Sequence, residues 1–387
     1  MRCTGSHDAL WSAVPRVRNR RLARCGGPAC LFFRSGISLY GICAAALLCF
    51  LVFLLPAAAS AQVPEPVVGS NARPSITVPR GPLPVFALYS SFWVNLHHVL
   101  YEQARLHTER PTVRSQSEAA KQGRAPLPMD VLNEQERRDW NAAVDEYEAK
   151  LAPHDLLFDQ DMVLMNDRLA EMGDNETAQV TGFRAGIIDA LAKAAPVYRS
   201  HWWPGDDRAN REWINSVAPL VEELGATISR RLSSIYRAPW PRGAIHVDVC
   251  AYAGVFGGYT TLDPLHITVS SRDPRNQQFA ALELLFHEAS HGLADPVRDA
   301  LNREFQAQSK AIPRDLWHAL LFYTTGQVVR RMLVGSGHDA YKPYAEENHL
   351  YERDWQTYQK ALDRDWAPYI ENHSDFATAI KRLANDL

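Results

Sequence analysis

Five consecutive residues of the chain, His287-Glu288-Ala289-Ser290-His291, have the types and spacing of a metal-binding helix. Positions i and i+4 of an α-helix lie one turn apart on the same face, so His287 and His291 can direct their imidazoles at one ion. Glu288 lies about 100° around the helix from His287. There its carboxylate can take a proton from a water molecule whose pKa the metal lowers. We therefore predict two zinc ligands, His287 and His291, and a general base, Glu288.

The surrounding sequence predicts that this segment lies on a helix preceded by strands. Residues 244–249 alternate between apolar and polar side chains, and residues 265–270 form a second β-rich run after a glycine-rich connection. Asp273 and Pro274 are typical of a helix start, and Gly292 is typical of a helix end. Two short strands are thus expected to lead into the helix that carries the motif.

This arrangement resembles the zincin metallopeptidases, whose strand-then-helix core carries H-E-x-x-H. The resemblance covers about residues 240–335. It implies one zinc ion per chain, bound by His287 and His291, with Glu288 as general base. It also implies a peptide or protein substrate, and it makes residues 265–270 the edge strand that holds this substrate by strand addition.

A catalytic zinc ion needs a third protein ligand and one open position. One zincin branch continues the motif with a glycine and a third ligand, but Ala294 and Val297 stand at those positions. The gluzincin branch takes a glutamate from the next long helix, whereas this chain has no Glu between Glu304 and Glu346. An apolar helical segment in that interval contains His318, which we predict to be the third ligand. Glu304 remains the alternative.

A hydrogen-bond donor to the carbonyl oxygen would complete a hydrolytic site, because negative charge develops on that oxygen during attack. Four residues downstream of the motif could supply it, namely Tyr323, Tyr341, Tyr344 and His349. Each of them could equally have a structural role. The sequence does not choose among them.

The N-terminus has the pattern of a secretory leader. A basic region precedes the apolar residues 37–55, and small residues follow up to Ala61. This pattern predicts a signal peptide over 1–61 and export to the periplasm or the medium. The alternative is a membrane anchor, because an uncharged run as long as 37–55 can just span a bilayer.

Charge and cysteine content agree with an exported globular protein. Residues 1–61 hold seven Arg and one Asp, a net +6, so about −9 remains after them when the whole chain carries −3. An acidic chain without a basic patch is not expected to bind nucleic acid. Of the six cysteines only Cys250 follows the leader, so an internal disulfide is excluded there and the hydrophobic core must hold the fold.

The predicted fold class is mainly α (α+β). A Pro-rich linker over 62–84 precedes a helical region, 85–238, which packs on a zincin-like catalytic region, 239–387. Helices of the first region are expected at 85–110, 130–151, 157–172, 175–197 and 206–236. The predicted function is an exported zinc metallopeptidase of undetermined oligomeric state. The alternatives are a non-catalytic metal-binding envelope protein and a helical interaction protein in which the motif arose by chance.

Overall fold

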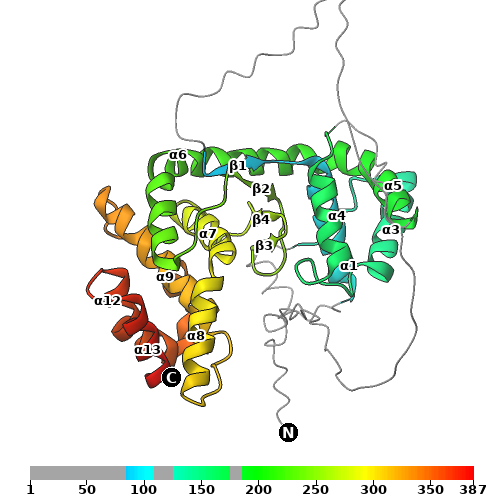
Figure 1. Cartoon of the computed structure of the whole chain (residues 1–387). Helices are drawn as coiled ribbons and strands as arrows, with labels where there is room; N and C mark the ends of the chain where they lie inside the picture. The colour runs from blue at the N-terminus through cyan, green and yellow to red at the C-terminus, as the bar shows by residue number, and fades with distance from the viewer. Residues whose placement is uncertain (1–83, 109–124, 175–184) are drawn as a thin grey trace, which may run out of the picture. The chain divides into compact units, whose positions relative to one another are not determined.

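The residues that the computed structural model describes, 84–108, 125–174 and 185–387, form helices around one four-stranded sheet (Figure 1). This confirms the mainly α fold with a small sheet. The predicted leader and anchor lie outside the described residues, as does the linker up to residue 83. Every helix within the described part is too short or too polar to cross a membrane.

The sheet has the strand order β1-β2-β4-β3. The strands are β1 (Phe86–Tyr89), β2 (Ile245–Cys250), β3 (Gly258–Leu262) and β4 (Leu265–Ser270). β1, β2 and β4 run parallel, and β3 pairs antiparallel with β4. The sequence predicted β2 and β4 but assigned residues 265–270 to the edge, which is wrong. β4 lies inside the sheet, and the strand beyond it is β3.

Two strands were not predicted. Residues 86–89 were expected to begin a helix, but they form β1 because β2, far along the chain, supplies a parallel hydrogen-bonding partner. β3 begins at Gly258, in what the sequence analysis took for a glycine-rich connection. Its formation depends on the antiparallel pairing with β4.

Side chains on the two faces of the sheet enter different cores. Val247, Val249, Ile267 and Val269 belong to a large apolar cluster that also includes residues of helices α6, α7 and α9. The opposite face looks towards α1 and α4 (Figure 1), where a second apolar cluster packs. The period of two along each strand sends alternate residues to these two environments.

The helices before β2 mostly match their predicted spans. They are α1 (Phe92–Thr108), α3 (Glu134–Lys150), α4 (Gln160–Ala170), α5 (Ala185–His201) and α6 (Trp203–Tyr236). Asn133 caps α3 in a reciprocal capping box with Glu136, at the point where the periodic pattern begins. α6 begins three residues before its predicted start because Pro204 fits the first turn of a helix.

The first of the helices after the sheet carries the motif. They are α7 (Phe279–Ser290), α8 (Asp295–Ala307), α9 (Leu316–Gly335), α10 (Tyr344–Glu347), α11 (Gln356–Ala361), α12 (Ala367–Ile370) and α13 (Phe376–Asp386). The predicted helix start at Asp273 is wrong. Its carboxylate accepts hydrogen bonds from Arg275, and Asn276 bonds the carbonyl of Gly257, so the chain turns against the sheet before α7 begins.

Asn95 of α1 joins the helical region to the sheet. Its amide nitrogen donates to the carbonyl oxygens of Ser91 (2.9 Å) and Val249 (3.2 Å). Its amide oxygen accepts from the backbone N–H of Ala251 and from the side chain of Asn210, each at 3.0 Å. Asn95 is fully buried, so losing this side chain would leave several polar groups unsatisfied.

We therefore expect Asn95→Ala to lower the free energy of unfolding by about 2 to 4 kcal/mol. Urea denaturation followed by circular dichroism measures this change. The matched control is Asn302→Ala, at an exposed position of α8, which should stay within about 0.5 kcal/mol of the wild type. Equal stability of the two variants would show that Asn95 does not hold the two parts together.

Candidate metal centre

Two helices position the predicted ligands. α7 is buried from Ala281 to Ser290 and carries His287 and Glu288 near its C-terminal end, and His291 follows at its C-cap. α9 packs against α7 and carries His318 in its first turn. The loop between α8 and α9 thus brings a histidine distant in sequence onto the face that the motif presents.

The three histidines come together. Each offers a ring nitrogen that lies within 4.8 Å of the other two. The exposed fraction is 2% for His287 and 4% for His318, and the side chain of His291 is 15% exposed. Glu304 does not belong to this group, and its carboxylate accepts a hydrogen bond from Gln308 at 3.0 Å. Of the two alternatives for the third ligand, the geometry favours His318.

Burial keeps these imidazoles neutral. It lowers the pKa of His287 and of His318 well below the usual value, and the neighbouring histidines add to the effect. Burial, with a smaller contribution from Arg298, lowers the pKa of His291 to about 4. Neutral imidazole is the form that binds zinc. Nδ1 of His287 is buried and has no hydrogen-bond partner among the described residues, so the group fits a metal ion.

Aromatic side chains hold the imidazole rings in place. Trp317, Phe322 and Trp355 all contact rings of the histidine group. The ring of Phe322 stacks on His287 with centroids 3.7 Å apart and planes inclined by 22°. Ring orientation in this group is therefore set largely by packing, in an environment where electrostatic interactions are strong.

Glu288 is buried beside the histidines. Its Oε2 lies 3.9 Å from Nε2 of His291 and accepts a hydrogen bond from Oγ1 of Thr260 at 2.8 Å. Burial raises the pKa of Glu288 to about 7, although the bond from Thr260 acts in the opposite direction. A carboxyl group with this pKa can take up and release a proton near neutral pH. Thr260 was not predicted, because it lies on the unpredicted strand β3.

Three of the four proposed oxyanion donors are engaged elsewhere. The hydroxyl of Tyr323 donates to Asp363, and that of Tyr341 donates to Glu283, each at 2.6 Å. The side chain of His349 is 66% exposed, and its Nδ1 lies 3.0 Å from Oε2 of Glu352 on the surface. These positions do not direct a donor at the histidine group.

Tyr344 differs from the other three candidates. Its ring is buried and stacks with Phe322, the residue that in turn stacks on His287. Burial raises the pKa of its hydroxyl, and the charge of Glu288 contributes to the increase. The Tyr344 hydroxyl therefore keeps its proton and is the best placed of the four to donate a hydrogen bond.

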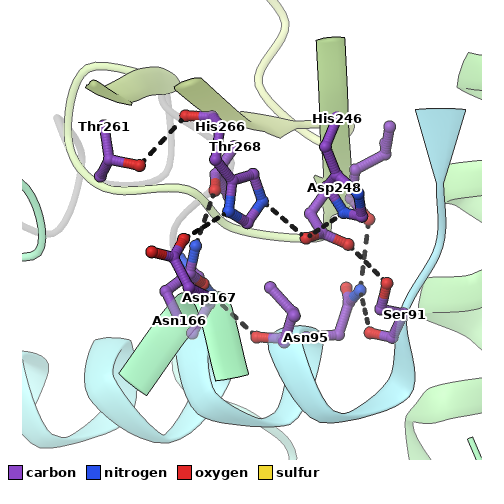
Figure 2. Close-up of polar contacts among 12 residues, drawn as sticks. Ser91, Asn95, Asn166, Asp167, His246, Asp248, Thr261, His266 and Thr268 are labelled. Carbon is purple, nitrogen blue, oxygen red and sulfur yellow. Dashed lines mark hydrogen bonds and ion pairs between the residues drawn. The ribbon is translucent and has the colours of Figure 1, made fainter. Parts of the chain in front are cut away.

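A second group with metal-ligating side chains lies on the other face of the sheet and was not predicted. His246, Asp248 and His266 offer ligand atoms within 4.8 Å of one another (Figure 2). A signal was present in the sequence, because His246 and Asp248 occupy alternate positions of a strand that is otherwise apolar up to Cys250.

No protein-family model, curated protein or solved structure matches this chain. The resemblance to the zincins therefore depends on the motif and on the elements around it.

The buried carboxyl group of Glu283, one turn before the motif, makes the stability of the fold depend on pH. Glu283 is fully buried, and its carboxylate accepts hydrogen bonds from Tyr341 and from the backbone N–H of Tyr344. Burial raises its pKa to about 7 from 4.5. The folded state binds this proton more tightly than the unfolded state does. The protonated Glu283 therefore makes its full contribution to the free energy of unfolding at low pH. This contribution is lost as the pH rises through 7.

We expect Glu283→Gln to remove this dependence. As the pH rises from 5 to 8, the wild type should lose roughly 2 kcal/mol more free energy of unfolding than the variant does. Denaturant titrations at several pH values measure the difference, with Glu223→Gln at an exposed site of α6 as the control for the loss of one carboxylate. Parallel pH profiles for Glu283→Gln and the wild type would contradict this role.

Proposed function

We propose that the protein is an exported zinc-dependent hydrolase, a metallopeptidase, with His287, His291 and His318 as zinc ligands and Glu288 as general base. The observation that carries the proposal is the convergence of three neutral imidazoles beside a buried carboxyl group with a pKa near 7. The proposal of export depends on the N-terminal pattern over 1–61.

In the proposed mechanism each of these side chains has a separate role in hydrolysis. Bound Zn²⁺ would supply Lewis acidity and lower the pKa of water at the position that three protein ligands leave open. Glu288 takes up the proton of the attacking water and later releases it. Thr260 donates to Oε2 of this carboxylate, the oxygen that lies 3.9 Å from Nε2 of His291, and so holds the base beside the ligands.

The edge strand β3 is the proposed platform for an extended peptide. It is the last strand of the sheet, so within the described residues its outer edge has no neighbouring strand and could pair with an added one. Thr260 ties this strand to Glu288, and a Cβ atom placed on Gly258 would lie 3.5 Å from Oε1 of the same carboxylate. A peptide added to β3 would therefore run close to the general base. This proximity supports a peptide or protein substrate.

Tyr344 is the proposed donor to the developing oxyanion. Burial keeps its hydroxyl protonated, and its ring stacks on Phe322, which itself stacks on His287. A preorganised donor of this kind stabilises the charge that appears during attack on the carbonyl carbon.

The group within the described residues contains three histidines, so an ion bound there would have a position left for water or substrate. The carboxyl group of Glu288 beside this group, and not the number of ligands, argues for a catalytic metal. A protein in which the motif arose by chance would bind no metal at this group.

The mechanism predicts that Glu288→Gln keeps the metal and loses activity. The substitution removes the base without removing a ligand, so hydrolysis of a broad peptide library should fall by about 10²- to 10⁴-fold. Metal analysis and mass spectrometry of the digested library measure the two properties. Glu212→Gln, at an exposed position of α6, is the control and should retain full activity. Undiminished hydrolysis by Glu288→Gln would exclude the mechanism.

The third ligand is tested by comparing His318→Ala with Glu304→Ala. His318→Ala should lose one equivalent of zinc, with an affinity at this centre lowered by at least about 100-fold. Glu304→Ala should keep the zinc, because its carboxylate is directed at Gln308. Chelator competition measures the affinity, and circular dichroism checks the fold. If zinc affinity survives the loss of His318, the assignment is wrong.

A further inference from the structure

The parallel pairing of β2 and β4 gathers three metal-ligating side chains on one face of the sheet. His246 and Asp248 are two residues apart on β2 and therefore point to the same side. His266 of β4 is the direct register partner of His246. All three face α1 and α4 (Figure 2), on the side of the sheet opposite to the α7 core.

The ligating atoms converge on a small volume. Oδ2 of Asp248 lies 2.8 Å from Nε2 of His266 and 3.1 Å from Nε2 of His246. Ligands at about 2.0 to 2.2 Å from a tetrahedral zinc ion lie about 3.4 Å apart. The observed separations are those of hydrogen bonds and are a few tenths of an ångström shorter, so small shifts of these side chains would admit one ion between them.

Each of the two buried ligands is also oriented by a second partner. Nδ1 of His266 hydrogen-bonds to Oδ1 of Asp167 on α4 at 2.8 Å. The second oxygen of Asp248, Oδ1, accepts from the hydroxyl of Ser91, just before α1, at 2.5 Å. A carboxylate behind a ligating histidine and a donor behind a ligating carboxylate are the usual supports of a metal site.

Burial and charge also favour a cation. Asp248 is fully buried, and the side chain of Asp167 is 15% exposed, so two carboxylates lie close together largely away from water. Buried negative charge requires compensation. The side chain of His246 is 36% exposed, which leaves one side of the group accessible to an ion from solvent.

A protonated His266 is the competing source of positive charge. Burial lowers the pKa of this residue, but the hydrogen bonds to Asp167 and Asp248 outweigh it and raise the pKa to about 9. A protonated ring explains the contacts of His266 with the two carboxylates. The contact of Nε2 of His246 with the same oxygen of Asp248 fits either a hydrogen bond or a shared metal ion, and the metal titration distinguishes the two.

We propose that His246, Asp248 and His266 bind a second divalent transition-metal ion of the zinc type. Two imidazoles and one carboxylate form a ligand set for such ions, and three protein ligands leave the side of His246 open. Through Ser91 and Asp167 the site connects β2 and β4 to α1 and α4. The ion therefore stabilises the packing of the helical region on the sheet. This inference does not depend on the proposed peptidase activity.

The test is a metal titration of the full chain after chelation. Zn²⁺ is the probe, measured by competition with a chromophoric chelator, and Co²⁺ absorption serves as the second measurement. The wild type should bind two equivalents with dissociation constants below about 1 µM. His246→Ala and His318→Ala should each bind one equivalent, and the double variant should bind none. The control His373→Ala, at a 73% exposed side chain, should bind two.

Thermal unfolding separates the two centres. In His318→Ala, where only the second site remains, saturating Zn²⁺ should raise Tm by roughly 5 °C, and His246→Ala in the same background should abolish the increase. If His246→Ala binds as much zinc as the wild type, and as tightly, the second site does not exist and the group is an ion triad around protonated His266. If only His318→Ala loses bound zinc, the result supports the first centre and not the second.

Discussion

Helix α7 is buried along most of its length although it carries ionisable side chains into the core. Burying an isolated charge costs more free energy than the whole stability of a typical folded protein. Such groups must therefore be neutral, paired or bound to a cation. Glu283 is satisfied by Tyr341 and the backbone of Tyr344, and Glu288 by Thr260. The contacts of β3, α9 and the segment around α10 with this helix follow from that requirement.

The small sheet separates two chemically different environments. The valines and isoleucines of β2 and β4 face the α7 core, and the polar residues at alternate positions face α1 and α4. β4 pairs with a neighbouring strand along each edge, and residues on both of its faces are buried. The histidines of the motif and the histidines of the strands therefore lie on opposite sides of one layer. Each group can have its own function without sharing ligands.

The sequence predicted the parts of the centre that depend on local spacing. The helical motif follows from its period, and His318 followed from the absence of a glutamate where a third ligand was needed. The structure places His318 beside the motif, whereas metal binding itself remains a prediction. β1 could not be predicted, because its four residues become a strand only through pairing with β2. The positions of Thr260 and Tyr344 beside the motif could not be predicted either, because they too depend on contacts between segments that are distant in the sequence.

The two histidine groups differ in the charge of their ligands, and this difference separates their expected chemistry. His287, His291 and His318 are neutral and are held by aromatic rings, so a bound divalent ion would keep its full charge for polarising water and a carbonyl group. Asp248, supported by the nearby Asp167, would neutralise much of the charge of an ion at the other group. The first environment suits catalysis, and the second suits the stabilisation of packed elements. Glu288, the proposed general base, lies beside the first group, in agreement with this division.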